Sequence, residues 1–253
     1  MSFDSDRTDP KELGITKVPR HVAVIMDGNG RWARQRGWIR LRGHREGAKA
    51  VKRTLEESYR LGVEYLTLFA FSTQNWDRPS TEVEGLMGLL LEYLHSERRE
   101  LLRRGIRFRA IGDLSRLPQN LQNEIAALSE MSKDNDEMHL VVALSYGARD
   151  EIVRATRALA AAAVAGEIKP EDIGEADVSA RLYTADMPDP DLLIRTSGEL
   201  RVSNFMLWQL AYAELFVTDV FWPDFAKDNL IEALQAYSKR ERRFGLTGAQ
   251  VKK

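Results

Sequence analysis

Six short apolar runs, separated by helix-length segments, constrain the fold more than any other feature of this 253-residue sequence. The runs are rich in β-branched residues and have the length of buried strands. No hairpin-type turn joins two of them, so each connection must be a crossover. The strands are expected at residues 21–26, 65–71, 106–111, 138–144, 191–194 and 214–217. This pattern predicts an α/β fold: a single domain with a mostly parallel six-stranded sheet flanked by helices.

The segments between the runs carry helix start and stop signals. Residues 81–103 predict the longest helix, with capping-box spacing between Thr81 and Glu84 and a stop at Gly105. A basic helical stretch is expected after residue 30. The remaining helices are expected near 45–61, 118–131, 149–165, 176–184, 204–212 and 227–242.

The ends of the chain and its composition indicate a protein that works in the cytoplasm. Residues 1–19 are polar and are expected to form a flexible arm, residues 20–245 the folded domain, and residues 246–253 a tail. The start is acidic, without the apolar core of a signal peptide. No apolar run approaches the roughly 18 residues of a membrane span. The absence of cysteine excludes disulfides and thiolate metal sites.

The charge is unevenly distributed along the chain. The formal net charge is −1, which argues against a nucleic-acid-binding protein. Residues 20–53 nevertheless carry +8, and the rest of the chain sums to −9. A local basic field on a nearly neutral protein indicates a small anionic ligand bound at one place.

Three polar loops follow predicted strands and are expected to meet at one edge of the sheet, where ligands bind in parallel α/β folds. The first begins at Asp27 and continues as Gly28-Asn29-Gly30-Arg31, the composition of a phosphate-binding turn. A carboxylate beside a phosphate site suggests Mg²⁺ between them. The alternative interpretation is that Asp27 caps a helix and the glycines form a turn. A dinucleotide-binding G-x-G-x-x-A match is weak, because no acidic residue ends the second strand.

The other two loops and the following helix add cations. The loop at 72–79 places a hydroxyl, an amide and Arg78 beside Trp76, which suggests a moving lid, unless Trp76 is simply packed. The loop at 195–204 holds Arg195 and Arg201, and guanidinium pairs bind phosphates by bidentate hydrogen bonds. Arg40 and His44 are four residues apart and can share one helix face.

Together these motifs make the sequence resemble the cis-prenyltransferases, and the bacterial undecaprenyl diphosphate synthases in particular. The resemblance covers nearly the whole chain. It rests on HVAVIMDGNGRWA (21–33), GHREGA (43–48), FAFSTQNWDRP (69–79), SYGARDEI (145–152), DLLIRTSGELRVSNFMLWQLAYAEL (191–215), FWPDF (221–225) and RERRFG (240–245).

The resemblance implies a Mg²⁺-dependent enzyme that condenses isopentenyl diphosphate onto an allylic diphosphate, with farnesyl diphosphate as the expected primer. The implied product is a long Z-polyprenyl diphosphate such as undecaprenyl diphosphate, a lipid-carrier precursor for cell-wall synthesis. It also implies a homodimer and allows peripheral membrane contact for product release. The alternative is a non-catalytic accessory subunit, but such members lack the metal-binding Asp and the phosphate turn, which this chain retains.

The resemblance also implies roles for individual residues. Asp27 would ligate Mg²⁺, and Glu214 would lie near the metal from the partner subunit. Asp27, Ser72 and Asn75 are the candidate catalytic residues. The residues expected to bind the allylic diphosphate are Gly28, Asn29, Gly30, Arg31, Trp32, Arg40, His44 and Arg78, with Ser72 and Trp76 orienting the substrates. The residues expected to bind isopentenyl diphosphate are Arg195, Arg201 and Ser203, while Arg243 would reach into the partner's site.

A hydrocarbon product of this length requires an apolar enclosure, expected as a tunnel beside the sheet. A helix over 81–103 would extend roughly 34 Å. The candidate walls are Leu86, Leu89, Leu90, Tyr93, Met138 and Leu140. The alternative for each of them is an ordinary place in the core. As a set they favour the tunnel, because an apolar helix with glycines, here Gly85 and Gly88, and few polar interruptions suits a tunnel wall better than a tight contact with the sheet.

Overall fold

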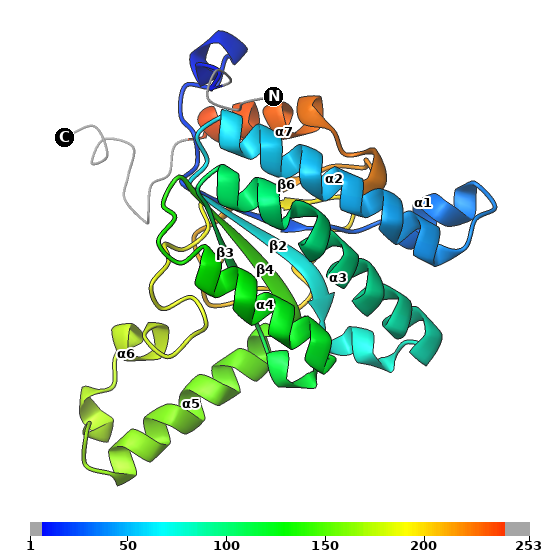
Figure 1. The fold of residues 1–253 in the computed structure, drawn as a ribbon. Coiled ribbons are helices and arrows are strands. Elements are labelled where there is room, and N and C mark those ends of the chain that lie inside the picture. Colours follow the sequence, from blue (N-terminus) through cyan, green and yellow to red (C-terminus); the bar gives the residue numbers. More distant parts are fainter. Residues whose placement is uncertain (1–6, 241–253) are drawn as a thin grey trace.

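The six expected strands form one fully parallel sheet in the computed structural model, which describes residues 7–240 (Figure 1). The sheet order is β3-β4-β2-β1-β5-β6. The strands are β1 His21–Ile25, β2 Tyr65–Ser72, β3 Ile106–Ile111, β4 Met138–Tyr146, β5 Leu192–Arg195 and β6 Glu214–Val217. The helices are α1 Asn29–Gln35, α2 Arg40–Arg60, α3 Ser80–Arg103, α4 Gln119–Met131, α5 Ala148–Val164, α6 Glu175–Ser179 and α7 Lys227–Ser238.

The two faces of the sheet are covered differently. Helices α7, α2, α3 and α4 lie side by side over one face and form the larger core with it (Figure 1). The opposite face is covered by the start of α5 and by the segment around Phe205 and Met206, which make a second, smaller core. Strands β1, β4 and β5 therefore bury apolar side chains on both faces, which explains why their runs are continuous rather than alternating.

The strand register brings three strand ends together. Ile25 at the end of β1 pairs with Phe69 of β2 on one side and with Arg195 of β5 on the other. The sheet order reverses between β1 and β5, which creates a crevice at the carboxyl ends of the strands. The loops after β1, β2 and β5 all open into this crevice, as the sequence predicted.

Two local predictions are wrong. Residues 204–212 form turns instead of a helix, because Ser203, Asn204 and Met206 adopt left-handed backbone conformations with φ of 49°, 60° and 45°. The capping box between Thr81 and Glu84 does not form, since α3 already begins at Ser80, directly after Pro79. The rest of the prediction for this helix is confirmed: it was expected over 81–103, and α3 covers 80–103. Among the described residues, no helix is long and apolar enough to span a bilayer.

His21 is a fully buried titratable group at the amino end of β1. Its Nδ1 lies 2.7 Å from the carbonyl oxygen of Pro188, and its Nε2 lies 2.7 Å from Thr67 Oγ1. Burial lowers the pKa of His21 to about 4, although the hydrogen bond to Pro188 and the charge of Asp191 partly oppose this effect. The ring is therefore neutral at physiological pH and acts as a structural link between β1 and β2.

Acidification should weaken the fold through His21. In the unfolded chain histidine takes up its proton near the ordinary pKa of 6.5, whereas the folded chain does so near 4. Between these values the unfolded state binds more protons, so stability falls as the pH is lowered, by about 3 kcal/mol for this one group. Urea unfolding at a series of pH values measures the loss. His21→Leu should be less stable at pH 7.5 but lose less on acidification. An equally steep decline in this variant would rule out His21 as the source.

Candidate active site

The loop after β1 places Asp27 at the carboxyl end of the sheet. Gly28 has a φ of +105°, and a Cβ at this position would lie 2.7 Å from Phe221 Cδ1. Glycine avoids both the backbone strain and the clash. The turn leads through Gly30 into Arg31, and this segment lines a polar cleft of about 380 Å³.

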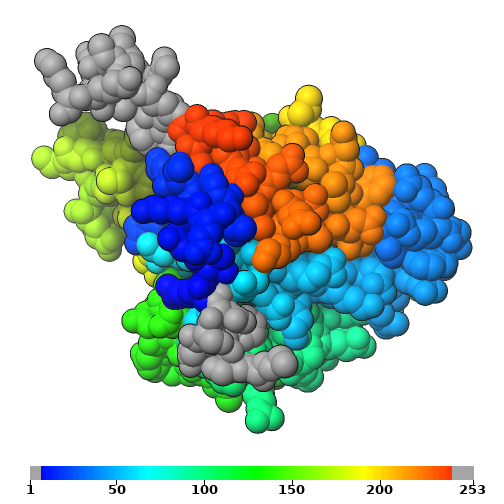
Figure 2. All heavy atoms as spheres, turned by 90° about the horizontal axis from the view of Figure 1, so that it is seen from above, coloured from blue at the N-terminus to red at the C-terminus, as the bar shows by residue number. Residues whose placement is uncertain are grey.

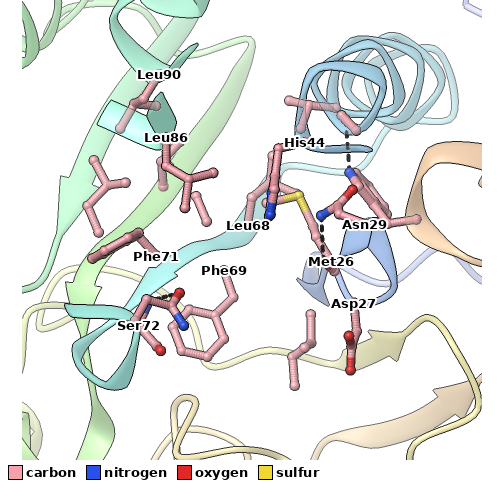
Figure 3. Close-up of a pocket in the computed structure, with 18 of the residues that line it drawn as sticks. Met26, Asp27, Asn29, His44, Leu68, Phe69, Phe71, Ser72, Leu86 and Leu90 are labelled. Carbon is pink, nitrogen blue, oxygen red and sulfur yellow. Dashed lines mark hydrogen bonds between the residues drawn. The ribbon is translucent and has the colours of Figure 1, made fainter. Parts of the chain in front are cut away.

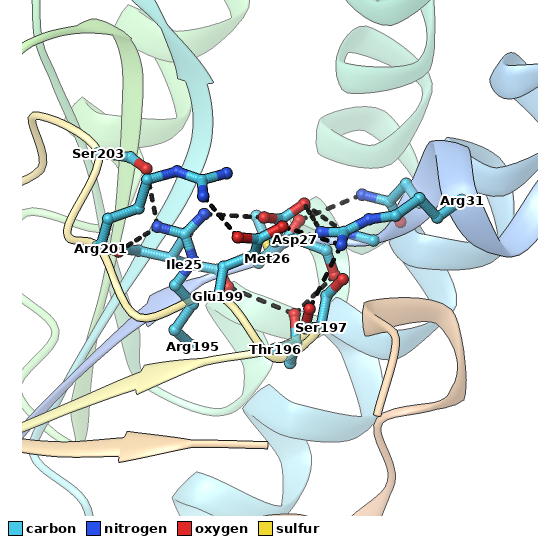
Figure 4. A network of polar contacts seen from close by, with 12 residues as sticks. Ile25, Met26, Asp27, Arg31, Arg195, Thr196, Ser197, Glu199, Arg201 and Ser203 are labelled. Atoms are coloured by element: carbon cyan, nitrogen blue, oxygen red, sulfur yellow. Dashed lines mark hydrogen bonds and ion pairs between the residues drawn. The ribbon is translucent and has the colours of Figure 1, made fainter. Parts of the chain in front are cut away.

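Asp27 is held between two guanidinium groups (Figure 4). Its Oδ2 accepts a hydrogen bond from Arg195 Nη2 at 2.8 Å, and its Oδ1 lies 3.2 Å from Arg31 Nη2. The amide of Gly28 also donates to Oδ1, at 2.7 Å. Burial alone would raise the pKa of Asp27, but the hydrogen bond from Arg195 and the charge of Arg31 outweigh it and hold the pKa below its usual value. Asp27 is therefore a carboxylate that tethers two cations.

The loop after β5 forms the opposite side of the cleft. Arg195 is almost fully buried, with an exposed fraction of 3%, and donates from Nη1 to Ser203 Oγ at 2.7 Å and to the carbonyl oxygen of Arg201. Glu199 bridges two arginines: its Oε1 lies 3.0 Å from Arg31 Nη1, and its Oε2 lies 2.5 Å from Arg201 Nη1 (Figure 4). The three residues predicted to bind one diphosphate, Arg195, Arg201 and Ser203, are thus joined to the turn that was predicted to bind the other.

The left-handed segment after Arg201 is fastened to the start of α5. The carbonyl oxygen of Asn204 accepts from the amide of Ala148 at 2.8 Å, and its side-chain Oδ1 accepts from the amide of Arg149 at 2.9 Å. Asn204 thereby satisfies two free N–H groups of the helix terminus. It also fixes the neighbouring Ser203 in the position where Arg195 reaches it.

Helices α2 and α3 supply the third wall of the cleft. Arg40 and His44 both lie in α2, as predicted, and Arg78 directly precedes α3. Glu82 links the two arginines, with its Oε1 3.3 Å from Arg40 Nε and 3.0 Å from Arg78 Nη1. Like Glu199, Glu82 holds arginines in the cleft without having been predicted. Its spacing of four residues from Arg78, at the beginning of a helix, is the sequence signal that could have identified it.

Two residues that line the cleft, Asn29 and His44, each carry a buried polar side-chain atom without a hydrogen-bond partner within residues 7–240. Among the described residues, none hydrogen-bonds to His44 Nε2 or Asn29 Oδ1, and both atoms are buried. Burial, followed by the charge of Arg78, lowers the pKa of His44 to about 4, so the ring is neutral. Buried polar groups without partners are costly, and a ligand in the cleft could form a hydrogen bond with His44 Nε2. Asn29 Oδ1 instead faces Gly47 of α2, where an added Cβ would lie 2.3 Å from it.

An apolar cavity of about 600 Å³ adjoins the polar cleft (Figure 3). The two share Met26, Asp27, Asn29, His44 and Arg78, so the cavity opens at the cationic cleft. The apolar walls come from the neighbouring strands β2 and β4 and from α2 and α3: Val51, Leu68, Phe71, Leu86, Leu89, Leu90, Tyr93, Val142 and Leu144. This arrangement accommodates a ligand with an anionic head and a hydrocarbon tail.

Some of the predicted walls lie elsewhere. Met138 and Leu140 are buried in the core, and on β4 it is Val142 and Leu144 that line the cavity, because the cavity lies nearer the carboxyl end of the sheet. The glycines of α3 do not face the cavity. A Cβ on Gly85 would lie 2.9 Å from Leu41, so this glycine allows α3 to approach α2, while Gly88 is exposed.

Ser72 and Asn75 line the apolar cavity but not the polar cleft, and Figure 3 shows Ser72 at the end of β2. Asn75 Oδ1 accepts a hydrogen bond from the amide of Ser72 at 3.0 Å, which fixes the turn that follows β2. Their catalytic role stays a prediction.

Trp32 and Trp76 do not face the cleft or the cavity. Trp32 is buried, donates from Nε1 to Asp224 Oδ1 at 2.7 Å and stacks under Arg36. Trp76 donates from Nε1 to Ser145 Oγ at 3.0 Å and packs edge-on against Phe71. Both indole rings fix the loops that carry the binding residues. Trp76 is therefore packed against the protein, which was the alternative to its forming part of a moving lid.

The cleft fits Mg²⁺ only together with phosphate ligands. Within residues 7–240 no cluster of three acidic or histidine side chains is present that could hold a metal ion. Mg²⁺ is commonly bound by one or two carboxylates plus substrate phosphates, and Asp27 can supply one carboxylate. Glu214 lies at the amino end of β6, where its Oε2 is 2.6 Å from Arg240 Nη1, so within one chain it is at the opposite end of the sheet from Asp27. Its role from a partner subunit stays a prediction, as does that of Arg243, which lies outside the described residues.

Comparison with known proteins places this site in a family. The family model described as "Putative undecaprenyl diphosphate synthase" matches residues 25–245. A ditrans,polycis-undecaprenyl-diphosphate synthase of Vibrio cholerae, described as specific for (2E,6E)-farnesyl diphosphate, is 51% identical over 235 residues, which cover 93% of this chain and 94% of the relative. An isoprenyl transferase of Heliobacterium mobile is 48% identical over 241 residues, covering 95% and 91% of the two chains.

Two solved structures have the same fold. Lavandulyl diphosphate synthase from Lavandula x intermedia, in complex with dimethylallyl diphosphate, superposes with a TM-score of 0.88 at 41% identity, covering 92% of this chain and 99% of the other. A probable undecaprenyl diphosphate synthase from Campylobacter jejuni gives a TM-score of 0.75 at 32% identity, covering 91% and 100%.

Proposed function

The chain belongs to the undecaprenyl diphosphate synthase family of prenyltransferases, and on that premise we propose that it elongates farnesyl diphosphate with isopentenyl diphosphate to a long Z-polyprenyl diphosphate. The observation that carries the proposal is the cationic cleft that opens into an apolar cavity, with Asp27 and Arg78 lining both. The head of each substrate is a diphosphate and its tail a hydrocarbon, so one site with these two halves fits both chemical parts.

The two diphosphates are assigned to opposite sides of the cleft. Arg31, Arg40, Arg78 and the backbone around Gly28 would bind the allylic diphosphate, with His44 Nε2 close by. Arg195, Arg201 and Ser203 would bind isopentenyl diphosphate. In the state described here Glu82, Glu199 and Asp27 neutralise these arginines. The incoming phosphates would take the place of the carboxylates as partners of the guanidinium groups, which form bidentate hydrogen bonds with phosphate oxygens as well as with carboxylates.

The chain supports ionisation of the primer by electrostatics. As the allylic carbon–oxygen bond breaks, negative charge grows on the departing diphosphate, and the preorganised guanidinium groups stabilise that charge. Mg²⁺, when bound at Asp27, would add positive charge to the same diphosphate. The apolar walls of the cavity keep water from the carbocation.

The second half of the reaction forms the new bond. The alkene of isopentenyl diphosphate attacks the allylic cation, and the C2 proton then leaves to form the Z double bond. Asp27 or a diphosphate oxygen is the acceptor, directly or through Ser72 and Asn75.

The experiment is chromatography of the radiolabelled products formed from farnesyl diphosphate, labelled isopentenyl diphosphate and Mg²⁺. We expect a ladder that ends in a long polyprenyl diphosphate and no product in the presence of a chelator. The purified chain alone should suffice, which distinguishes the enzyme from an accessory subunit. Lack of any elongation under these conditions would refute the proposal.

Asn204→Ala should weaken isopentenyl diphosphate binding without affecting the primer to the same degree. The variant loses the bond to the amide of Arg149 and places alanine in a left-handed conformation that asparagine tolerates better. We expect the KM for isopentenyl diphosphate to rise about tenfold, which corresponds to about 1.4 kcal/mol. Asn204→Gly is the matched control, because it relieves the backbone but still lacks the bond. Unchanged KM values in both variants would remove Asn204 from substrate positioning.

The assembly and the cellular setting extend this proposal. We propose a homodimer formed around the edge strand β6, where Leu207, Tyr212 and Leu215 are exposed apolar side chains. Its product would be the precursor of a lipid carrier for cell-wall synthesis. The cytoplasmic location and a peripheral membrane contact stay predictions at this point.

A further inference from the structure

The loop between α1 and α2, residues 36–39, presents apolar side chains to solvent at the rim of the cleft. Ile39 is 74% exposed and Trp38 is 37% exposed. Gly37 forms the bend with a φ of +69°, and a Cβ there would meet nothing within 4 Å, so the tip is open on that side. We call residues 36–39 the rim loop. In the space-filling view α1 and the start of α2 form the blue lobe that projects from the body of the molecule (Figure 2).

Cations surround the rim loop without matching anions. Residues 28–45 contain six arginines and neither Asp nor Glu. Arg34, Arg36, Arg42 and Arg45 are exposed. In the part of the chain that the structure describes, only Arg36 of these four pairs with a carboxylate, and its Nη2 is 3.4 Å from Asp224 Oδ2. Arg42 lies over the ring of Trp38, with its guanidinium carbon 3.7 Å from the ring centroid. The surface therefore carries a local positive field around an apolar tip.

This combination fits an anionic lipid surface. Aromatic and aliphatic side chains insert at the boundary between headgroups and acyl chains, while arginines reach the phosphates. Each cation near an anionic membrane contributes about 1 kcal/mol of attraction. A purely electrostatic partner such as a nucleic acid would leave Ile39 without a role, and the net charge of −1 gives the chain as a whole no attraction to a polyanion.

The rim loop also lies where a lipid product must leave. Arg34 and Arg40 flank the loop, and both line the polar cleft. A bilayer that contacts Trp38 and Ile39 would therefore lie beside the site that holds the product's diphosphate. We propose that the rim loop docks the enzyme onto an anionic bilayer, with Trp38 and Ile39 inserted and the surrounding arginines on lipid phosphates. This inference rests on the proposed function for its purpose, the delivery of a polyprenyl diphosphate to the membrane, but not for its test.

The test is flotation of the full chain with phosphatidylcholine vesicles that contain or lack phosphatidylglycerol. We expect binding to the anionic vesicles, a blue shift of tryptophan fluorescence and weaker binding at high salt. The double variant Trp38→Ser/Ile39→Ser should lower the partition coefficient about tenfold or more, since it removes the inserted apolar area. Arg36→Gln/Arg42→Gln should lower it to a similar degree on anionic vesicles.

The matched control is Met131→Ser/Val164→Ser, which removes two exposed apolar side chains outside the cleft and should leave the partition coefficient unchanged. Circular dichroism and elongation activity in detergent solution check that each variant is folded. The proposal is overturned if wild-type protein binds neither vesicle, if the rim-loop and control variants behave alike, or if the rim-loop variant changes the oligomeric state instead of vesicle binding. Vesicle binding without elongation would refute the proposed function but support the docking surface. Elongation without vesicle binding would support the proposed function but refute the docking surface.

Discussion

Asp27→Ala should abolish condensation while the protein still binds an allylic diphosphate. The substitution removes the carboxylate that is predicted to ligate Mg²⁺, but it leaves Arg31, Arg40 and Arg78 in place. We expect kcat to fall by about 10²–10⁴-fold, the range for groups that act on the reacting atoms. Single-turnover assays with labelled isopentenyl diphosphate measure the rate, and calorimetric titration with an unreactive allylic diphosphate analogue measures binding.

The same variant should respond strongly to pyrophosphate. Without Asp27 the buried guanidinium of Arg195 lacks its carboxylate partner, and an unpaired buried charge destabilises the fold. Inorganic pyrophosphate can take the place of the carboxylate, so it should raise the Tm of Asp27→Ala more than that of the wild type. Asp27→Asn is the matched control, because it keeps an acceptor for the Gly28 amide. Full activity in either variant would exclude Asp27 from the mechanism.

Leu90→Trp should shorten the products. Leu90 lies ten residues into α3, about 15 Å from its start, and lines the apolar cavity (Figure 3). A water molecule occupies about 30 Å³ in the liquid, and a methylene group is of similar size, so the 600 Å³ cavity holds roughly 20 such groups. A 15-carbon primer fits, but a much longer chain must extend past this wall. The larger indole should block that extension, and reverse-phase chromatography of the products measures their length.

Glu92→Trp provides the control for this experiment. Glu92 is exposed on the same helix, so a tryptophan there tests the effect of the substitution on α3 without filling the cavity. We expect its products to match those of the wild type. Products of unchanged length from Leu90→Trp and from a second wall variant, Leu86→Trp, would contradict the assignment of this cavity to the growing chain.

The strands and their parallel order could be predicted from the sequence because they depend on local composition. The runs at 106–111 and 214–217 match β3 and β6 residue for residue, and α3 begins one residue before its predicted start. The predicted helix over 204–212 failed for a non-local reason. Asn204 bonds to the start of α5, far away in the sequence, and the left-handed backbone that this contact holds is incompatible with a helix.

For the site, the sequence predicted which residues meet, but not the orientation of every side chain. Asp27, Arg78 and Arg201 were predicted to meet, and they do line one cleft, because parallel strands bring their following loops to the same edge. The sequence motifs could not predict which way the side chains of Trp32 and Trp76 point, since this depends on which neighbouring residue offers a hydrogen-bond acceptor. Trp32 finds Asp224, and Trp76 finds Ser145.

By itself the sequence determined the parallel α/β fold, the family and the cationic chemistry of three loops, because these follow from residue types and short spacings. Only the tertiary structure decided how the cations are paired and where the apolar cavity lies. Glu82 and Glu199 pair with arginines of the cleft, and Val142 and Leu144 replace Met138 and Leu140 as walls. Such contacts depend on distances between segments far apart in the chain, which no local pattern encodes.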